Sequence, residues 1–390
     1  MNATGKCRWP RVLADLDSGH PGPTLIVSGG IHGNEPAGVL AALEVTKALG
    51  ERGLQRGRLV ALVGNRSALG RGCRYVERDL NRRWFPDEIA ELRERDPAED
   101  TVEDREQREL LERIEPLLAG DRPAIFIDLH STSGGGPPFV CGADTLRNLD
   151  VAAALPLPMI LGLEEIIVGS MLGYLCNLGH SGLAIEGGQH DDPLTSRRHA
   201  SCIWLILHKL SMAQLGETKL EHHRRLLEDA CEGLPGFVEI RHRHVVETED
   251  EFVMKPGFTG FEPVEMGEVV AEDQRGPIEA PESGRMLLPR YQGQGEDGFF
   301  VTRDFPEWRL HLSAFMRRLR LDLLAPLLPG VRRDPDHPDQ LFTDRPSLSP
   351  LTSEMLALWG YRRRVVEGDR LVITRRRGDG PVDPFDPLRS

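Results

Sequence analysis

The sequence predicts an α/β fold in which a mostly parallel mixed sheet is flanked by helices, followed by a small all-β domain and a C-terminal extension. Short apolar runs typical of buried strands alternate with segments whose apolar residues recur at helical spacing. Near residue 236 this alternation gives way to short strand-like runs broken by Gly, Pro and acidic turns. The predicted domains are therefore 1–236, 237–305 and 306–390.

The first predicted domain begins with a strand at 23–30, PTLIVSGG, which runs into a glycine turn. The next segment, 36–50, is apolar at helical spacing, with Pro36 suited to a first helical position and Gly50 to the C-cap region. Further strands are predicted at 58–65, 124–130 and 183–188, and further helices at 87–120 and 195–230.

The C-terminal extension combines segments of different composition. Residues 306–326 have helical spacing, whereas 332–350 are rich in Pro and Asp and are interpreted as a linker. Residues 351–376 predict a short helix followed by a hairpin that turns at 367–369.

Composition excludes several classes of protein. The formal net charge is −13, and no basic block occurs in the first 300 residues, which argues against nucleic-acid binding. No stretch approaches the roughly 18 apolar residues of a membrane span, and the N-terminus has no apolar signal region. The six cysteines form no C-x-x-C pair, which is typical of reduced thiols. We therefore expect a cytoplasmic protein.

Two distant segments carry candidate metal ligands. His32 and Glu35 are three residues apart in GGIHGNEPAG, and His130 ends the apolar run AIFIDLH. Because sites gather at the carboxyl ends of parallel strands, both segments can converge on one ion. Two imidazoles and one carboxylate suit a catalytic zinc, one per chain, which keeps a fourth position for water. Taken singly, His32 and Glu35 are more simply explained as a loop histidine and a carboxylate that favours a helix N-terminus. His130 could likewise cap a strand end, with Asp128 as its hydrogen-bond partner.

Two further segments contain candidate catalytic or binding groups. Arg74, Asn81 and Arg82 lie in RYVERDLNRR, where guanidinium groups can hold a substrate carboxylate, although a solvated turn would look the same. Glu186 ends the apolar run GLAIE and precedes two glycines, a pattern that suits a general base.

In this order, HGNEPAG, RDLNRR, IDLHSTSGG and IEGGQ resemble the succinylglutamate desuccinylase/aspartoacylase family, part of the wider zinc carboxypeptidase superfamily. The resemblance covers roughly residues 20–300. It implies a zinc carboxypeptidase-like catalytic domain, followed by a β domain that narrows the pocket.

The resemblance also implies roles for individual residues. The implied zinc ligands are His32, Glu35 and His130. Glu186 would be the base, Arg74 would help to polarise the carbonyl, and Asn81 with Arg82 would bind the substrate carboxylate. Aspartate-specific members carry a further arginine ahead of the catalytic glutamate, where this chain has YLCNLGHSGLA, so N-acetylaspartate specificity is not expected. They also use a tyrosine from the β domain, for which Tyr291 is the candidate.

The sequence thus predicts a zinc-dependent hydrolase that cleaves the amide bond of an N-acyl amino acid or a related small carboxylate-bearing amide, with water activated by zinc and Glu186. Two alternatives stay open. One is a carboxypeptidase acting on small peptides, and the other is a non-catalytic metal-binding regulatory protein. The expected partner is a small-molecule substrate, with no nucleic acid and no membrane, and homo-oligomerisation is left open.

Overall fold

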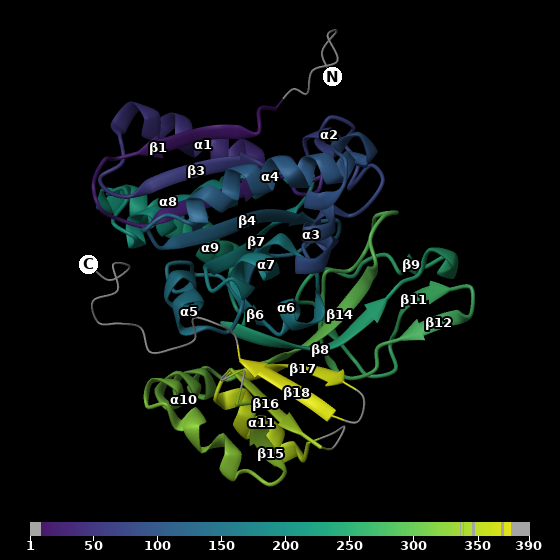
Figure 1. Ribbon diagram of the computed structural model, residues 1–390. Helices are drawn as coiled ribbons and strands as arrows, with labels where there is room; N and C mark the ends of the chain where they lie inside the picture. Colours follow the sequence, from purple (N-terminus) through teal and green to yellow (C-terminus); the bar gives the residue numbers. More distant parts are fainter. Residues whose placement is uncertain (1–8, 336, 338, 345–347, 368–369, 376–390) are drawn as a thin grey trace.

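The computed structural model describes residues 9–335, 337, 339–344, 348–367 and 370–375. Its largest feature is a mixed sheet of eleven strands with helices on both faces (Figure 1). Two smaller sheets, of three and four strands, form after residue 250. The predicted α/β fold with a further all-β region and a C-terminal extension is confirmed.

The strand order of the large sheet explains where a site can form. Neighbouring strands β3, β2, β4 and β7 run parallel, so their carboxyl ends meet at one edge. In spatial order the strands are β1 (Val12–Asp17), β3 (Arg58–Val63), β2 (Thr24–Gly29), β4 (Ala124–Thr132), β7 (Ser181–Gln189), β5 (Phe139–Cys141), β6 (Met159–Leu161), β8 (Phe237–Val245), β14 (Asp297–Asp304), β13 (Gly284–Leu287) and β10 (Pro263–Val264).

Most of the helices lie between these strands in the chain, and the last ones follow the final strand of the large sheet. The α-helices are α1 (Ala37–Arg52), α2 (Arg66–Leu69), α3 (Pro86–Glu94), α4 (Val102–Leu118), α5 (Leu146–Ala152), α6 (Leu163–Ile166), α7 (Met171–Asn177), α8 (Pro193–Lys209), α9 (Glu217–Glu228), α10 (Glu307–Arg318) and α11 (Pro350–Leu358). The 3₁₀ turns are η1 (Leu80–Arg82), η2 (Pro97–Glu99), η3 (Asp229–Cys231), η4 (Thr248–Asp250) and η5 (Leu321–Leu327).

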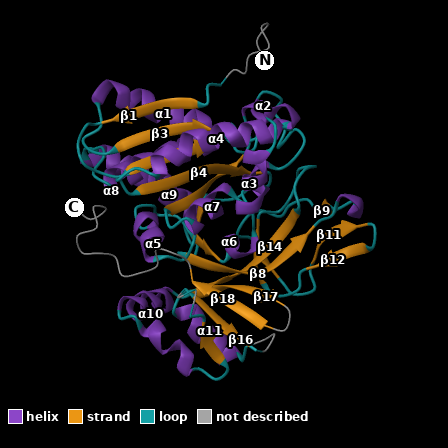
Figure 2. Ribbon diagram, in the orientation of Figure 1, coloured by secondary structure: helices purple, strands orange, loops and turns teal. Residues whose placement is uncertain are grey.

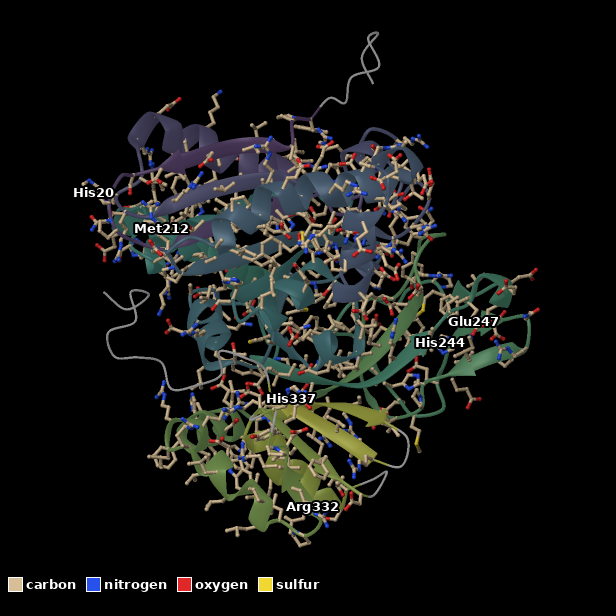
Figure 3. The ribbon with its side chains drawn as sticks, viewed as in Figure 1. His20, Met212, His244, Glu247, Arg332 and His337 are labelled. Carbon is tan, nitrogen blue, oxygen red and sulfur yellow. The ribbon has the colours of Figure 1, made fainter. Side chains whose placement is uncertain are left out.

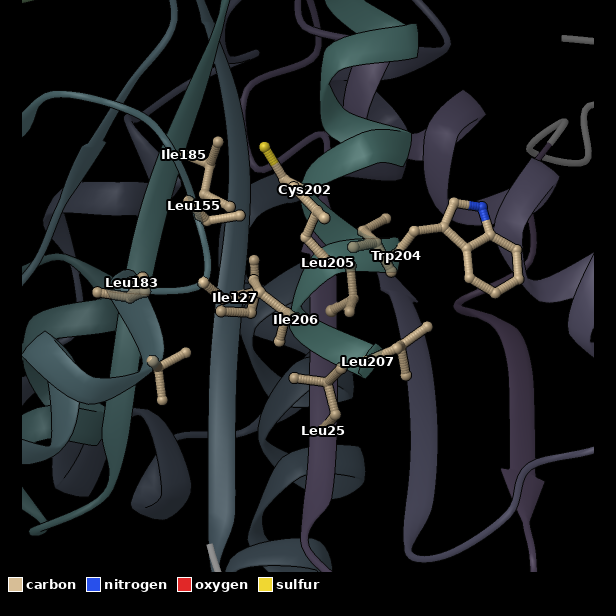
Figure 4. Packing of buried hydrophobic residues seen from close by; sticks show 14 of the residues in the cluster. Leu25, Ile127, Leu155, Leu183, Ile185, Cys202, Trp204, Leu205, Ile206 and Leu207 are labelled. Atoms are coloured by element: carbon tan, nitrogen blue, oxygen red, sulfur yellow. The ribbon is translucent and has the colours of Figure 1, made fainter. Parts of the chain in front are cut away.

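The two faces of the parallel strands bury different clusters. Leu25 and Val27 of β2 pack against α1 and α8, in the cluster shown in Figure 4. Ile26, between them, packs on the opposite face against residues of α4 and α7. This division follows from the two-residue period of a strand. Both faces of the central strands are therefore buried, as is usual for parallel strands.

The all-β segment after residue 236 shares the large sheet. Figure 2 shows strand and loop through most of this segment. Its strands β8, β14, β13 and β10 continue the eleven-stranded sheet, whereas β9 (Val253–Met254), β11 (Val269–Asp273) and β12 (Gly276–Glu279) form a separate three-stranded sheet. The boundaries 1–236, 237–305 and 306–390 remain predictions.

The C-terminal extension builds a third sheet around its own core. The strands are β15 (Val331–Arg333), β16 (Gln340–Thr343), β18 (Arg370–Arg375) and β17 (Tyr361–Glu367), with Leu341 and Tyr361 fully buried among them. The interpretation of 332–350 as a linker is therefore wrong, because this range contains β16 and most of β15, which pair with each other. The predicted helix and hairpin over 351–376 are confirmed by α11, β17 and β18, while the turn residues 368–369 lie outside the described residues.

Two predicted helices are divided. The segment 195–230 forms α8 and α9, which are separated by a turn in which Ser211 has a φ of 55°. The segment 87–120 forms α3 and α4, separated by η2, which begins at Pro97. The spacing of apolar residues does not reveal such turns, because it stays helical on both sides of each turn. Every helix in the described part of the chain is too short or too polar to cross a lipid bilayer.

Candidate metal centre and active site

The three predicted metal ligands come together at the edge where β2 and β4 end. His32 and Glu35 lie in the turn between β2 and α1, and His130 lies on β4. Nδ1 of His32 is 2.9 Å from Glu35 Oε1, and Nδ1 of His130 is 3.1 Å from Glu35 Oε2. One ligand atom from each residue lies within 4.8 Å of the others, and all three side chains are buried. This group could hold one metal ion.

The tight approach of the turn depends on glycine. Gly30 has a φ of 71°, a conformation that favours glycine. A Cβ on Gly33 would lie 2.0 Å from the carbonyl carbon of Ala68, so this position has no room for a side chain. The backbone can therefore fold closely enough to bring His32 and Glu35 together.

The outer nitrogen of each histidine faces a carboxylate. Nε2 of His130 lies 3.0 Å from Asp128 Oδ2, and Nε2 of His32 lies 3.2 Å from Asp79 Oδ1. Carboxylates in this position fix the tautomer and ring orientation of metal-ligating histidines. Both rings therefore turn Nδ1 toward Glu35. The donor set of two nitrogens and a carboxylate fits zinc. Asp79 was not identified from the sequence, although it lies in the RDLNRR segment.

Glu186 lies on β7 directly beside the metal group, since it is the register partner of His130 on β4. Its Oε2 is buried and has no hydrogen-bond partner among the described residues. Burial raises the pKa of Glu186 to about 7. A carboxylate with such a pKa, in a cavity beside a candidate metal site, is suited to proton transfer near neutral pH.

Arg74 also lies beside the metal group. Its Nη2 and Nε donate to Asp79 Oδ2 at 3.1 and 3.2 Å, and its Nη1 lies 3.7 Å from Glu35 Oε1. The guanidinium is therefore held at the cavity wall by the same carboxylate that orients His32.

Asn81 and Arg82 also line this cavity, but each is tied to another element. Asn81 Oδ1 accepts a hydrogen bond from the backbone N–H of Met171 at 2.9 Å. Arg82 Nη2 donates to Asp297 Oδ2 of β14 at 2.9 Å, and Arg243 Nε donates to the other oxygen of Asp297 at 2.6 Å. The sequence did not reveal this carboxylate. Arg82 thus enters the cavity as half of an ion pair.

Tyr291 does not join the other predicted residues. Its hydroxyl lies 2.7 Å from the carbonyl oxygen of Lys255, and its side chain is 40% exposed. The neighbours Arg290 and Gln292 line the cavity instead. The backbone N–H of Tyr291 donates to Ser133 Oγ at 3.0 Å. This bond holds the backbone of the loop and not the aromatic ring of Tyr291.

Two glutamines fasten the loop between β13 and β14 across the cavity. Gln292 Oε1 accepts from Asn34 Nδ2 at 2.8 Å. Gln294 Oε1 accepts from the backbone N–H of Arg74 at 3.2 Å, and its Nε2 donates to the carbonyl oxygen of Tyr75 at 3.3 Å. Neither glutamine was identified from the sequence. The loop therefore contacts both walls of the site.

A family model, the succinylglutamate desuccinylase/aspartoacylase catalytic domain, matches residues 21–211. Residues 21–211 thus correspond to the catalytic domain of the succinylglutamate desuccinylase/aspartoacylase family. The matched range contains the metal group, Arg74, Asn81, Arg82 and Glu186.

Curated relatives of this family match over parts of their length. A probable aspartoacylase from Synechococcus sp. (strain CC9605) is 35% identical over 133 residues, which are 33% of this chain and 40% of that protein. An N-acyl-aromatic-L-amino acid amidohydrolase from Homo sapiens is 36% identical over 110 residues, which are 27% of this chain and 33% of that protein. The chain thus spans two fifths or less of the length of these relatives.

Solved structures of the family share the fold. A succinylglutamate desuccinylase/aspartoacylase from Rhodobacter sphaeroides aligns with a TM-score of 0.55 and 20% identity, covering 74% of this chain and 87% of its own. A succinylglutamate desuccinylase from Chromobacterium violaceum aligns with a TM-score of 0.52 and 18% identity. This alignment covers 78% of the present chain and 96% of the desuccinylase.

Replacing His32 by Ala is expected to keep the zinc content well below one ion per chain, because one of the three candidate ligands is lost. Elemental analysis after dialysis measures this. The matched control is His20→Ala, since His20 is exposed at the opposite end of the strands (Figure 3). Full zinc content in His32→Ala would remove His32 from the ligand set.

Replacing Gln294 by Leu is expected to lower kcat/KM about tenfold, because two hydrogen bonds that position the Arg74–Tyr75 backbone are lost. Steady-state kinetics measures the change. The exposed Gln274 provides the matched control, Gln274→Leu, which should leave kcat/KM unchanged. An equal loss in both variants would show that the effect does not come from the loop.

Proposed function

We propose that this chain is a zinc-dependent amidohydrolase that cleaves the amide bond of an N-acyl amino acid or a related small carboxylate-bearing amide. The observation that carries the proposal is the buried group of His32, Glu35 and His130 with the unpartnered Glu186 Oε2 beside it. Named relatives include amidohydrolases and desuccinylases, which supports hydrolysis of an amide.

Each residue of the site has a separate role in the proposed reaction. A zinc ion held by His32, Glu35 and His130 would supply a Lewis acid and lower the pKa of water. Glu186 accepts the proton of the attacking water and delivers it to the leaving amine nitrogen. Arg74 donates hydrogen bonds to the oxyanion that develops on the scissile carbonyl, and such a donor contributes about 3–4 kcal/mol.

Substrate binding is assigned to the wall formed by Asn81 and Arg82. Nε of Arg82 is buried and has no hydrogen-bond partner among the described residues, so this N–H can donate to a substrate carboxylate. Asp297 holds the other side of the guanidinium and so orients it. When the substrate carboxylate is held at this wall, the amide bond lies near Glu186. Binding therefore also orients the substrate for reaction.

The described cysteines support a reducing compartment. No disulfide joins Cys73, Cys141, Cys176, Cys202 or Cys231 to another described residue. Free thiols are typical of proteins that work in the cytoplasm, so we assign the reaction to that compartment.

A substrate screen tests the proposed function. The purified chain, loaded with Zn²⁺, would be offered N-acetyl and N-succinyl amino acids with apolar, acidic and basic side chains, together with dipeptides. We expect release of the free amino acid from at least one N-acyl substrate, its loss on chelation and its recovery with zinc. Cleavage of dipeptides alone would favour the carboxypeptidase alternative. Stoichiometric zinc without turnover of either class would favour the regulatory alternative.

A further inference from the structure

Helix α10 carries an apolar stripe on its outward face. Trp308, Leu312, Phe315 and Leu319 follow one another at intervals of four, three and four residues, and they are 65%, 38%, 58% and 55% exposed. Because residues three and four apart lie on the same side of a helix, these four side chains form one continuous row. Figure 1 shows α10 along the outer edge of the C-terminal unit.

The stripe cannot rotate inward, because the opposite face of α10 is already fixed. Ser313 Oγ donates to the carbonyl oxygen of Leu358 at 2.8 Å. Arg317 Nη2 donates to Asp144 Oδ2 at 2.9 Å, and both side chains of this ion pair are buried. Exposure of the stripe is therefore a property of the folded chain.

The segment after the helix also exposes apolar side chains. In η5, which follows α10 directly, Leu323, Leu324 and Leu327 are 60%, 47% and 80% exposed. Single exposed apolar residues are common, whereas a contiguous set of this kind marks an interaction site.

We propose that two copies of this chain form a two-fold symmetric dimer in which their α10 helices pack antiparallel along this stripe. Alternating intervals of three and four residues give the 3.5-residue repeat of a seam between two helices. A two-fold axis at the middle of the stripe places Trp308 opposite Leu319 of the partner subunit, and Leu312 opposite Phe315 of the partner subunit. The surface is thus self-complementary, as a two-fold interface requires.

Charges beside the stripe favour the antiparallel arrangement. Glu307 and Arg318 are both exposed and lie eleven residues apart, which is close to three full turns and places them on the same flank. Antiparallel packing brings Glu307 of one copy to Arg318 of the partner subunit, and the reverse pair forms by symmetry. Parallel packing would place this flank of the two copies on opposite sides of the seam, so neither pair could form.

A lipid surface fits this helix less well than a second copy. Helices that lie on membranes present free basic side chains beside their apolar face. Here Arg309 Nη2 lies 3.4 Å from Glu354 Oε2, and Arg320 Nε lies 3.6 Å from Asp322 Oδ1. The net charge of −13 would also oppose approach to an anionic leaflet.

Sedimentation equilibrium of the full chain over a range of concentrations tests the dimer. We expect the wild type to dimerise and Phe315→Glu to raise the dissociation constant at least about tenfold. Met266→Glu is the matched control, because Met266 is 71% exposed on the all-β segment, and its dimer should be unchanged. A wild type that stays monomeric overturns the proposal, as does a dimer that Phe315→Glu leaves intact.

A charge exchange tests the orientation. Glu307→Arg and Arg318→Glu are each expected to weaken the dimer, and the double variant is expected to restore it. Single variants that weaken the dimer without recovery in the double variant would overturn the antiparallel arrangement. Binding of a monomeric wild type to phosphatidylserine vesicles, lost in Phe315→Glu, would replace the second copy by a lipid surface.

Discussion

Replacing Glu186 by Gln is expected to lower kcat about 10²–10⁴-fold while the chain keeps one zinc ion. Glutamine has nearly the same shape as glutamate, but it cannot accept the proton of the attacking water. The three candidate ligands His32, Glu35 and His130 do not include Glu186, so the metal should stay bound. Steady-state kinetics and elemental analysis on the same preparation measure both quantities.

The control for this variant is Glu44→Gln, because Glu44 is exposed on α1 and remote from the cavity lining. It should retain full activity. Near-normal turnover in Glu186→Gln would falsify the role of Glu186 as base. A parallel loss of zinc and activity would instead make Glu186 a ligand.

The pH profile should report the same group. Burial raises the pKa of Glu186 to about 7, whereas the nearby positive charge of His130 acts to lower it, as a bound cation would. A general base must be ionised, so kcat should fall as the pH falls through a value at or below about 7. The residual activity of Glu186→Gln should lack this acidic limb.

Replacing Arg317 by Ala is expected to lower the free energy of unfolding by about 3–5 kcal/mol. Arg317 and Asp144 are 1% and 3% exposed at their side chains, and their ion pair joins α10 to the loop before α5. Removal of the guanidinium takes the positive charge of Arg317 away from the buried Asp144 carboxylate, which costs more than an ordinary lost contact.

Urea denaturation at a fixed protein concentration measures this change, since dimerisation would otherwise shift the apparent stability. Arg225→Ala is the control, because Arg225 donates to Glu221 on the surface of α9, where ion pairs contribute little. Combining Arg317→Met with Asp144→Leu should recover most of the loss, because both charges are then removed together. A loss as small as that of the control would show that solvent reaches the pair.

Much of the site could be predicted because its residues lie at strand ends. His130 and Glu186 each end an apolar run in the sequence, and β4 and β7 pair in parallel with these two residues opposite each other. Parallel strands bring their carboxyl ends to one edge, so a local pattern was enough to place distant residues together.

Other parts depended on contacts that no local pattern encodes. Asp79 meets His32 across 47 positions, Asp297 meets Arg82 across 215, and Gln294 meets Arg74 across 220. The predicted use of Tyr291 rested on a resemblance, whereas the bend of the loop places Arg290 and Gln292 at the cavity.

The sequence by itself determined the class of fold, the strand ends that carry the candidate ligands and base, and the family, because these follow from hydrophobic periodicity and short motifs. Only the tertiary structure decided which carboxylates orient His32 and Arg82, how the β13–β14 loop crosses the cavity, and which face of α10 is exposed. These outcomes depend on how elements far apart in the chain pack together. Many carboxylates in the sequence could have contacted His32 or Arg82, and only the packing decides which of them do.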